Sequence, residues 1–397
     1  MADIAFREDA LSAPRISRHH HQKLAGSRWE FRVDNDLAAY ERASMHAIFA
    51  PAQSPEWIEA WAKSGTDIII ARVHAAQGQC VLALALEVVR TSSMCIARYV
   101  GHRHANGNFP LSSYESIDRI EPGLLDALLE SISTARPDID LVSLERMSHS
   151  RAGKANPFLA LNHQQSANIA LAADLTDGFD ALVARTGGSS KWKKHRRQVR
   201  KFSESGEVRM IYASTAVEVD RLLTSFFEMK AERFAALGID DPFAPMSVRA
   251  AFRNLFSEAL SGQVRLFTLE GLEIGGKLRA VSGHSHDGAR LVCEFCAFAN
   301  DELSNYSPGS YLFFEVIKKA AENDYRLYDF SVGDEPYKRQ WCDAEIKQFD
   351  VVVPLTLRGR IAAAGLRAGS SAKRWLKSQP HIWQQAKRLR QIVKGNA

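Results

Sequence analysis

The residues best suited to chemistry begin with Ser307-Pro308-Gly309-Ser310, which stands between strand-like segments and an apolar segment with helical periodicity. Proline and glycine here indicate a turn into the first turn of a helix. The N-terminus of a helix presents unpaired N–H groups and the positive end of the helix dipole, which together favour an anion. A thioester cofactor with a pyrophosphate is one ligand of that kind. The alternative is that Pro308-Gly309 only begins the helix.

Charged residues follow the next strand-like segment, in a turn that contains Gly333 and Pro336. An ammonium group near a developing oxyanion stabilises acyl transfer, which makes Lys338, next to Tyr337, a candidate for that contact. Asp334 could take a proton from an acceptor amine, directly or through water. A solvated Lys338 paired with Asp334 or Glu335, and Asp334 as a turn former, are the competing interpretations.

Three further polar residues lie inside predicted strands, where such side chains are unusual. Asp329 could line the site or cap a neighbouring loop, and Glu294 and His284 could serve as base and substrate ligand if both point toward it. A satisfied or surface position is the alternative for each. Cys293 and Cys296 have C-x-x-C spacing, but residues three apart on a strand face opposite sides, and no second pair completes a zinc site. We expect no metal.

A basic segment from Lys191 to Lys201 contains seven Lys/Arg and no acidic residue. Trp192, His195, Val199 and Phe202 recur in it at helical spacing, which predicts a helix packed through these four. Its charged faces could hold phosphates, nucleic acid or an anionic polysaccharide. A solvated amphipathic helix is the alternative.

The net charge of +5 is unevenly distributed along the 397 residues. Ten Lys/Arg and no Asp/Glu follow Asp350, which leaves 41 basic and 46 acidic residues in 1–350. Trp375 and Trp383 lie among the basic residues of 358–397, a pattern typical of basic amphipathic helices. Such a tail could bind an anionic membrane surface or an acidic ligand, or pack on the protein itself.

The length predicts two domains, and the five scattered cysteines exclude a secreted disulfide framework. Acidic and basic residues arrive early in the first 25 residues, which we interpret as a mobile extension without a signal peptide. No run of 18 apolar residues occurs. We therefore expect a cytoplasmic protein, with peripheral attachment to the inner membrane face as an option through the tail.

The predicted elements occur twice in the same order: two helices, three antiparallel strands, a helix and a strand. The first set comprises helices 36–49 and 55–63, strands 67–74, 79–90 and 94–100, helix 123–135 and strand 139–144. The second comprises helices 217–236 and 248–260, strands 264–269, 278–284 and 290–298, helix 311–323 and strand 327–330.

The order Ser-Pro-Gly, apolar helix, Asp-Phe, Gly-Asp and Tyr-Lys resembles GNAT-superfamily acyltransferases of the CelD/BioF2-like group, relatives of the Fem-type aminoacyl ligases. Ser54-Pro55-Glu56-Trp57, Tyr99-Val100-Gly101-His102 and the basic helix are similar to other parts of that group, as is Glu228-Met229-Lys230 with Arg233. The resemblance spans roughly residues 25 to 355.

The resemblance implies an α/β (α+β) fold of tandem GNAT-like domains, each with a central mixed, mainly antiparallel sheet flanked by helices. We expect a mobile extension at 1–25, an N-terminal domain at 26–180, a catalytic C-terminal domain at 181–357 and the tail at 358–397.

The resemblance also implies an acyl-CoA-dependent N-acyltransferase that acts on an amine, with an amino sugar of exopolysaccharide or envelope biosynthesis as the expected acceptor. Acetyl-CoA or another acyl-CoA would then bind at Ser307 to Ser310, and Arg233 could clamp a carboxylate or phosphate. A Fem-like ligase that uses aminoacyl-tRNA, and a catalytically degenerate adaptor that binds an acidic ligand or second messenger, remain as alternatives. The expected site comprises the catalytic Lys338, Asp334, Glu294 and Tyr337, the cofactor-binding Ser307, Pro308, Gly309 and Ser310, and the substrate-binding Arg233, His284 and Asp329.

Overall fold

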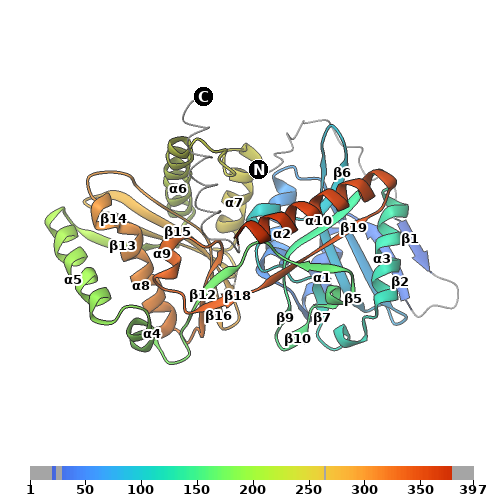
Figure 1. Cartoon of the computed structure of the whole chain (residues 1–397), viewed down its shortest axis with the longest axis horizontal. Helices are drawn as coiled ribbons and strands as arrows, with labels where there is room; N and C mark the ends of the chain where they lie inside the picture. Colours follow the sequence, from blue (N-terminus) through green and yellow to red (C-terminus); the bar gives the residue numbers. More distant parts are fainter. Residues whose placement is uncertain (1–19, 24–28, 263–264, 378–397) are drawn as a thin grey trace. The chain divides into compact units, whose positions relative to one another are not determined.

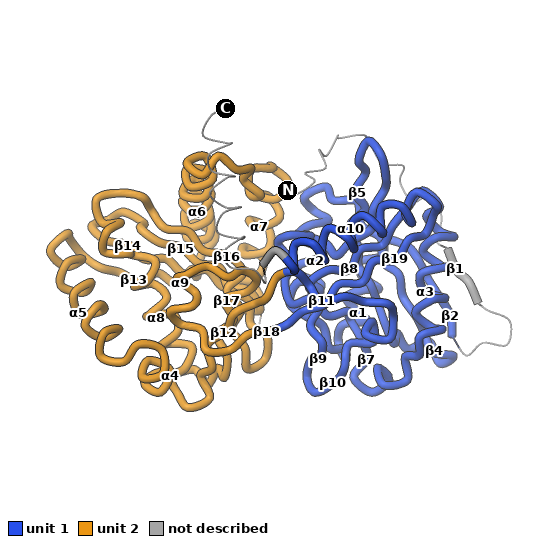
Figure 2. The backbone as a smooth tube through the Cα atoms, in the orientation of Figure 1, with its two compact units in different colours: residues 1–167, 347–382 blue, residues 168–346, 383–397 orange. Residues whose placement is uncertain are grey.

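The computed structural model describes residues 20–23, 29–262 and 265–377, and its element order is drawn in Figure 1. The chain forms two compact units, coloured separately in Figure 2. Unit 1 combines residues 1–167 with 347–382, and the described part of unit 2 is 168–346.

Unit 1 is built on a ten-stranded mixed sheet, whose main path runs β1-β2-β4-β5-β6-β8-β19-β11. Helix α3 covers one face through Leu125, Leu128 and Ile132, which are buried in one apolar cluster with side chains of β2 and β4. The strands are β1 (His20–Lys23), β2 (Trp29–Asp34), β3 (Ala47–Ile48), β4 (Ile68–Ala75), β5 (Cys80–Arg90), β6 (Cys95–Tyr99), β7 (Leu111–Ser113), β8 (Leu141–Ser148), β11 (His163–Gln165) and β19 (Gln348–Pro354), with the β9 (Ser150–Arg151) and β10 (Lys154–Ala155) hairpin beside them. The helices are α1 (Leu37–Ser44), α2 (Pro55–Lys63), α3 (Pro122–Ala135) and α10 (Leu357–Lys377).

Unit 2 is built on a seven-stranded mixed sheet in the order β13-β14-β15-β16-β17-β12-β18. Helix α8 packs on one face of β15 and β16, and helices α6 and α7 pack on the other through their phenylalanines. The strands are β12 (Ala170–Asp174), β13 (Val208–Tyr212), β14 (Phe267–Ile274), β15 (Lys277–Asp287), β16 (Arg290–Phe298), β17 (Leu327–Val332) and β18 (Ala344–Ile346). The helices are α4 (Phe179–Thr186), α5 (Gly188–Glu204), α6 (Ala216–Leu237), α7 (Met246–Glu258), α8 (Pro308–Glu322) and α9 (Pro336–Arg339).

The two sheets repeat the same connectivity. In unit 1, β6 pairs parallel with β8, which pairs antiparallel with β19. In unit 2, β16 pairs parallel with β17, which pairs antiparallel with β12. Helices α1 and α2 precede the central strands of unit 1 as α6 and α7 precede those of unit 2. The predicted α/β fold of two mixed, helix-flanked sheets is therefore confirmed.

The division between the units differs from the expected boundaries at 180 and 357, because each unit takes one strand from beyond them. Strand β12 comes before the expected boundary but pairs with β17 and β18 of unit 2. Strand β19 follows the second set of elements but pairs with β8 and β11 of unit 1. Unit 1 is consequently discontinuous in sequence, a feature that helix and strand periodicity does not reveal.

Local sequence explains where several helices begin. The Ser54 hydroxyl accepts from the Trp57 amide at the start of α2, with Pro55 as the first helical residue. Thr215 and Glu218 form a reciprocal capping box at the start of α6. The helix expected at 36–49 ends at Ser44 instead, and Ala47–Ile48 form the short strand β3.

The two terminal predictions need correction where the structure describes them. Residues 20–23 of the expected mobile extension form β1, which pairs with β2. In the tail, residues 357–377 form α10, whose Ala363 is buried and whose Arg367 donates to the Val352 carbonyl of β19. The first part of the tail therefore packs on unit 1. Trp383 lies outside the described residues, and binding of a membrane surface or an acidic ligand stays a prediction.

Membrane-spanning helices and metal-binding clusters are both absent from the residues that the structure describes. No helix among them is long and apolar enough to cross a membrane. In the same part of the chain, no group of three or more His, Cys, Asp or Glu side chains is arranged to hold a metal ion.

Candidate active site

The Ser-Pro-Gly-Ser turn begins helix α8, where its sequence placed it. Ser307 adopts a left-handed conformation (φ 58°, ψ 66°), and Pro308 is the first helical residue. A Cβ atom on Gly309 would lie 2.9 Å from Cδ1 of Phe298, so the close approach of α8 to the end of β16 requires glycine. Ser310 donates its amide to the Ser307 carbonyl, and Pro308 has no amide. The Gly309 amide is then the donor of this turn that lacks a hydrogen-bond partner among the described residues.

The basic helix α5 lies beside this turn. The buried Gln198 donates from Nε2 to the carbonyls of Tyr306 (2.7 Å) and Ser307 (3.0 Å). On the same side, the Arg197 guanidinium and the Lys201 ammonium lie 5.5 Å and 5.6 Å from the centre of the Tyr306 ring. The structure thus brings together two features that the sequence showed separately, the basic helix and the Ser-Pro-Gly turn.

The packing of α5 differs from the predicted stripe at one position. Trp192 and His195 contact Phe314 of α8, and Phe202 contacts Tyr311, as their spacing predicted. Val199 is 41% exposed instead. Gln198 takes the buried position because its amide satisfies the carbonyls of the α8 turn.

Arg233 of α6 reaches the same region from another direction. Its guanidinium lies over the Phe298 ring, 5.1 Å from the ring centre, and Phe298 is the residue that contacts Gly309. Arg233 is therefore close to the N-terminus of α8, the position expected of a residue that clamps a phosphate there.

Strands β16 and β17 pair over a short length and then diverge. The parallel register joins residues 290–292 to 327–329 and does not continue toward Phe298 and Val332 in the described structure. A β-bulge falls in β16 at the same level, where Gly283 opposes Phe295 and His284 opposes Cys293, so that Glu294 is the extra residue.

The bulge corrects the expectation that Cys293 and Cys296 face opposite sides. The extra residue Glu294 shifts the alternation, so both cysteines belong to the apolar cluster under α8, and Phe295 packs against Phe226 and Phe252 on the other face. The two thiols interact with each other, and burial together with this interaction raises the pKa of Cys293.

Glu294 and Asp329 are brought together on the α6 side of the sheet. Glu294 Oε1 accepts from the Ser285 hydroxyl at 2.6 Å, but its Oε2 is shielded from solvent and has no hydrogen-bond partner among the described atoms. Burial raises the pKa of Glu294 to about 8, and the negative charge of Asp329 adds to this. Burial also raises the pKa of Asp329, and the positive charge of Arg290 opposes this shift. A carboxyl with a raised pKa in such a place is suited to proton transfer.

Tyr337 and Lys338 lie on the short helix α9, next to the divergent strands. The Tyr337 ring stacks on Phe313 of α8, and its hydroxyl is 3.7 Å from the Cys296 sulfur on β16. The Lys338 ammonium is buried, donates to the Val332 carbonyl at 2.9 Å and lies 3.0 Å from a Glu335 carboxylate oxygen. Lys338 is therefore a buried residue that holds the end of β17.

The side chains of Asp334 and His284 are both engaged by other side chains of unit 2. The Asp334 side chain is about half exposed and pairs with Arg339 at 2.6 Å rather than with Lys338. His284 is fully buried, with Nδ1 on a Glu270 carboxylate oxygen and Nε2 2.8 Å from the Tyr328 hydroxyl. Both ring nitrogens are occupied, so a substrate contact by His284 would require this network to open. We assign it to the core of unit 2.

Unit 2 also contains a cavity of about 430 Å³, whose lining includes Glu232, the residue before Arg233. It is lined by residues of α6, of the start of β15 and of the segment after β16. Its acidic lining residues are Glu228, Glu232 and Asp301, and Asp301 pairs with Arg279. Glu228 and Met229, which belong to the Glu228-Met229-Lys230 segment of the family resemblance, line this cavity, but no sequence pattern predicted the cavity itself.

The residues that sequence reasoning missed are neutral. Gln198 positions the α8 turn, Ser285 orients Glu294, and Phe298 separates Arg233 from Gly309. A glutamine on the apolar face of a basic helix was the one available signal, because a buried amide needs hydrogen-bond partners.

This chain resembles a known protein family in sequence and known proteins in structure. Residues 189–339 match the family model described as acetyltransferase (GNAT) domain. No curated protein matches the sequence significantly. Among solved structures, FemX is 11% identical with a TM-score of 0.55, over 80% of this chain and 96% of FemX.

Two further structures resemble the chain less closely. L-PGS from Bacillus licheniformis is 10% identical with a TM-score of 0.48, over 78% of this chain and 96% of that one. A tandem GNAT protein from the clavulanic acid biosynthesis pathway is 13% identical with a TM-score of 0.47, over 83% and 99% of the two chains. The family model for a GNAT-type acetyltransferase domain thus matches α5 to α9 of unit 2, the elements that carry the candidate site, and the chain shares its fold with FemX.

Proposed function

We propose that unit 2 transfers an acyl group from acyl-CoA to an amine. The observation that carries this proposal is the convergence at the N-terminus of α8. Gly309 offers a free amide there, Arg197 and Lys201 approach over Tyr306, and Arg233 approaches over Phe298. A helix N-terminus with several cations suits a pyrophosphate.

The divergence of β16 and β17 gives the thioester a path to the acceptor. The α8 turn lies on one side of the sheet and Glu294 on the other, so a thioester placed between the strands would meet an amine from the α6 side. Backbone groups released by the divergence could hydrogen-bond the thioester oxygen as it becomes an oxyanion.

The residues then have distinct roles in direct transfer. The amine nitrogen attacks the thioester carbon and loses a proton to Glu294, directly or through water. The carbon–sulfur bond breaks, and the Tyr337 hydroxyl supplies a proton to the leaving thiolate. Lys338 and Asp329 act as positioning residues, through the end of β17 and through the charge beside Glu294 respectively.

For the acceptor we propose an amino sugar, as the resemblance to the CelD/BioF2-like group implies. The cavity of about 430 Å³ in unit 2 supports a polar acceptor, because its Glu228 and Glu232 would attract an ammonium group. An exopolysaccharide or envelope precursor is the corresponding substrate class.

The alternative donor is an aminoacyl-tRNA, as in the Fem-type ligases to which the sequence is related. Two observations favour it: the overall fold shared with FemX, and the exposed Lys193, Arg196 and Arg200 on α5. These cations could bind RNA phosphates.

Calorimetric titration of acetyl-CoA and longer acyl-CoAs, run beside a tRNA-binding assay, distinguishes the two donors. We expect acyl-CoA binding to weaken about tenfold or more in Arg197→Gln with Lys201→Gln, because charge-assisted contacts contribute about 1.5–3 kcal/mol. The matched control is Arg326→Gln, an exposed arginine elsewhere in unit 2. Binding of tRNA without any binding of acyl-CoA would favour the aminoacyl donor. Binding of neither would favour the remaining alternative, a catalytically degenerate adaptor.

A further inference from the structure

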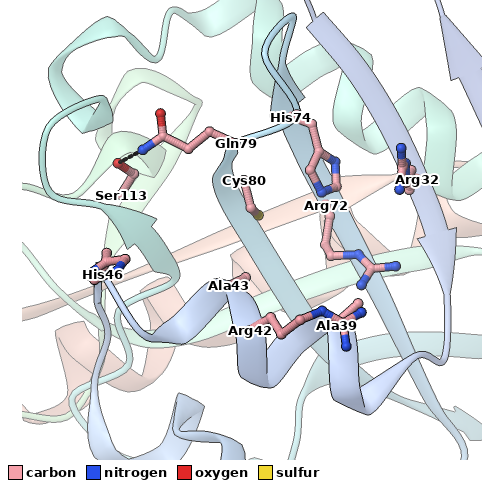
Figure 3. Close-up of a pocket in the computed structure, with 11 residues that line it drawn as sticks. Arg32, Ala39, Arg42, Ala43, His46, Arg72, His74, Gln79, Cys80 and Ser113 are labelled. Carbon is pink, nitrogen blue, oxygen red and sulfur yellow. Dashed lines mark hydrogen bonds between the residues drawn. The ribbon is translucent and has the colours of Figure 1, made fainter.

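Unit 1 contains a cavity of about 380 Å³ that the proposed acyl transfer does not use. It lies on the face of the sheet opposite α3, between α1 and the strands β2, β4, β5 and β7 (Figure 3). Its cationic lining residues are Arg32, Arg42 and Arg72, and no carboxylate lines it. The remaining lining residues are His46, His74, Gln79, Cys80, Ser113 and three small residues.

The central observation is the state of Arg72. This side chain is 3% exposed, and only Nη2 is paired, with the Asp34 carboxylate. Nε and Nη1 are buried without a hydrogen-bond partner among the described atoms. A buried guanidinium with two unsatisfied nitrogens costs free energy, which a ligand that accepts these hydrogen bonds would recover.

His74, two residues further along β4, also has a buried nitrogen without a hydrogen-bond partner among the described residues. It is buried, and its Nδ1 also has no partner in the described structure. Burial, together with the charges of Arg32 and Arg72 and against those of Glu30 and Asp34, lowers the pKa of His74 to about 4. The cavity is therefore a site of positive potential, which favours an anion.

The rest of the lining suits an anion that carries a polar body. Arg42 is an exposed residue of α1 at the rim, and Arg32 is partly exposed and pairs with Glu30. Gln79 and Ser113 lie opposite, 3.4 Å apart, and add neutral donors and acceptors. The volume falls within the range of sites for small molecules and exceeds that of a single inorganic anion.

We propose that this cavity binds a phosphorylated small molecule, a nucleotide or a sugar phosphate, with the phosphate on Arg72 and Arg42. Phosphate fits because several guanidinium groups converge on one place, and arginine is the side chain best suited to phosphate oxygens. Asp34 competes with the ligand for Arg72, and this competition gives the proposal a distinctive test.

The experiment is calorimetric titration of the full-length protein with 5′-AMP, glucose 6-phosphate, inorganic phosphate, malonate and adenosine. We expect one of the first two to bind most tightly, malonate more weakly and adenosine not at all. Arg42→Gln should weaken the tightest binding about tenfold. Arg119→Gln, which removes an exposed arginine of unit 1 outside the cavity, should leave it unchanged.

Asp34→Asn should strengthen binding, because asparagine keeps the oxygen that accepts from the Asp36 amide but removes the charge that competes for Arg72. A merely structural ion pair would give no such increase. If this variant is unstable, the ligand should raise its melting temperature more than that of the wild type, and Arg42→Gln still decides the outcome. The proposal is overturned if no phosphate probe binds at millimolar concentration, or if Arg42→Gln and Arg119→Gln behave alike. Variants of Arg233 in unit 2 should leave this binding unchanged, so failure of either site is distinguishable from failure of the other.

Discussion

Replacement of Glu294 by glutamine tests the proton-transfer step through two measurements that should move in opposite directions with pH. The pKa of this carboxyl is raised from about 4.5 to about 8 by burial. Between about pH 4.5 and about pH 8 the folded protein retains a proton that the unfolded chain releases, so the stability contributed by neutral Glu294 is lost progressively over this range and changes little above it. Activity should rise as pH approaches and passes about 8, because the proposed base must be ionised to accept a proton.

The size of the stability effect follows from the pKa. One pKa unit corresponds to about 1.36 kcal/mol, so between pH 6 and pH 9 the titration of Glu294 should lower the free energy of unfolding by about 2 to 3 kcal/mol. Glutamine keeps the oxygen that accepts from Ser285 and cannot ionise. The difference between wild type and Glu294→Gln should therefore change by this amount, and other titrating groups cancel in it.

The assay is urea unfolding at pH 6 and pH 9 on the protein without substrate, together with the pH dependence of kcat/KM once an acceptor is known. We expect the wild-type kcat/KM to increase with a midpoint near pH 8, and Glu294→Gln to lose this step along with about 100- to 10,000-fold in rate. Glu207→Gln, an exposed glutamate of unit 2, is the matched control. A stability difference that stays constant between the two pH values, or a rate step that survives in Glu294→Gln, would refute the reasoning.

Four other variants test the remaining assignments. Gly309→Val should weaken acyl-CoA binding at least tenfold by calorimetry, because its Cβ would displace Phe298 from the α8 turn; unchanged affinity would remove this turn from the cofactor site. Lys338→Ala should lower turnover about ten- to a thousandfold and also reduce stability by about 1–3 kcal/mol in urea unfolding, because the Val332 carbonyl loses its buried donor. Asp334→Ala, which breaks an exposed ion pair, should change stability by less than about 1 kcal/mol. Deletion of residues 358–397 should lower the melting temperature by calorimetry, since Ala363 is buried against unit 1; an unaltered melting temperature would show that α10 contributes nothing.

The sequence predicted best those features whose signal lies within one element. Helix α7, helix α2 and the turn at Pro308 are local features, and each lies close to where it was expected. The basic helix α5 is equally local. Residues of these elements could therefore be identified as candidates from the sequence, but the distances between them could not be predicted.

The features that the sequence did not reveal depend on pairing between distant segments. The bulge at Glu294 is defined by the register of β16 against β15, and no residue type requires it. The places of β12 and β19 depend on edges supplied by strands more than a hundred residues away. His284 shows the same limitation, because its partners Glu270 and Tyr328 come from two other strands.

The corresponding strands of the two units differ in a way that supports the proposed placement of the chemistry in unit 2. In unit 1, β6 and β8 also pair over only three positions, but the chain returns to cover the exposed edge of β8. The Asn108 amide donates to the Arg146 carbonyl, and the Ser148 amide donates to the Asn108 carbonyl. Asn108 is itself buried and held by Gln53. Backbone groups that a thioester would need are thus occupied in unit 1.

In unit 2, β17 corresponds to β8, and a backbone carbonyl at its end is hydrogen-bonded by a side chain. The Val332 carbonyl accepts from the side-chain ammonium of Lys338, and the neighbouring Ser331 hydroxyl is buried without a partner among the described atoms. A side chain can move aside for a ligand at far lower cost than a strand can. The cationic cavity of unit 1 lies on β4 and β5, away from the covered strands, so a unit that cannot admit a thioester between β6 and β8 can still bind a phosphate. In these proposals the two units, which share one fold, bind anions at different positions: unit 2 at the N-terminus of α8, and unit 1 around the buried Arg72.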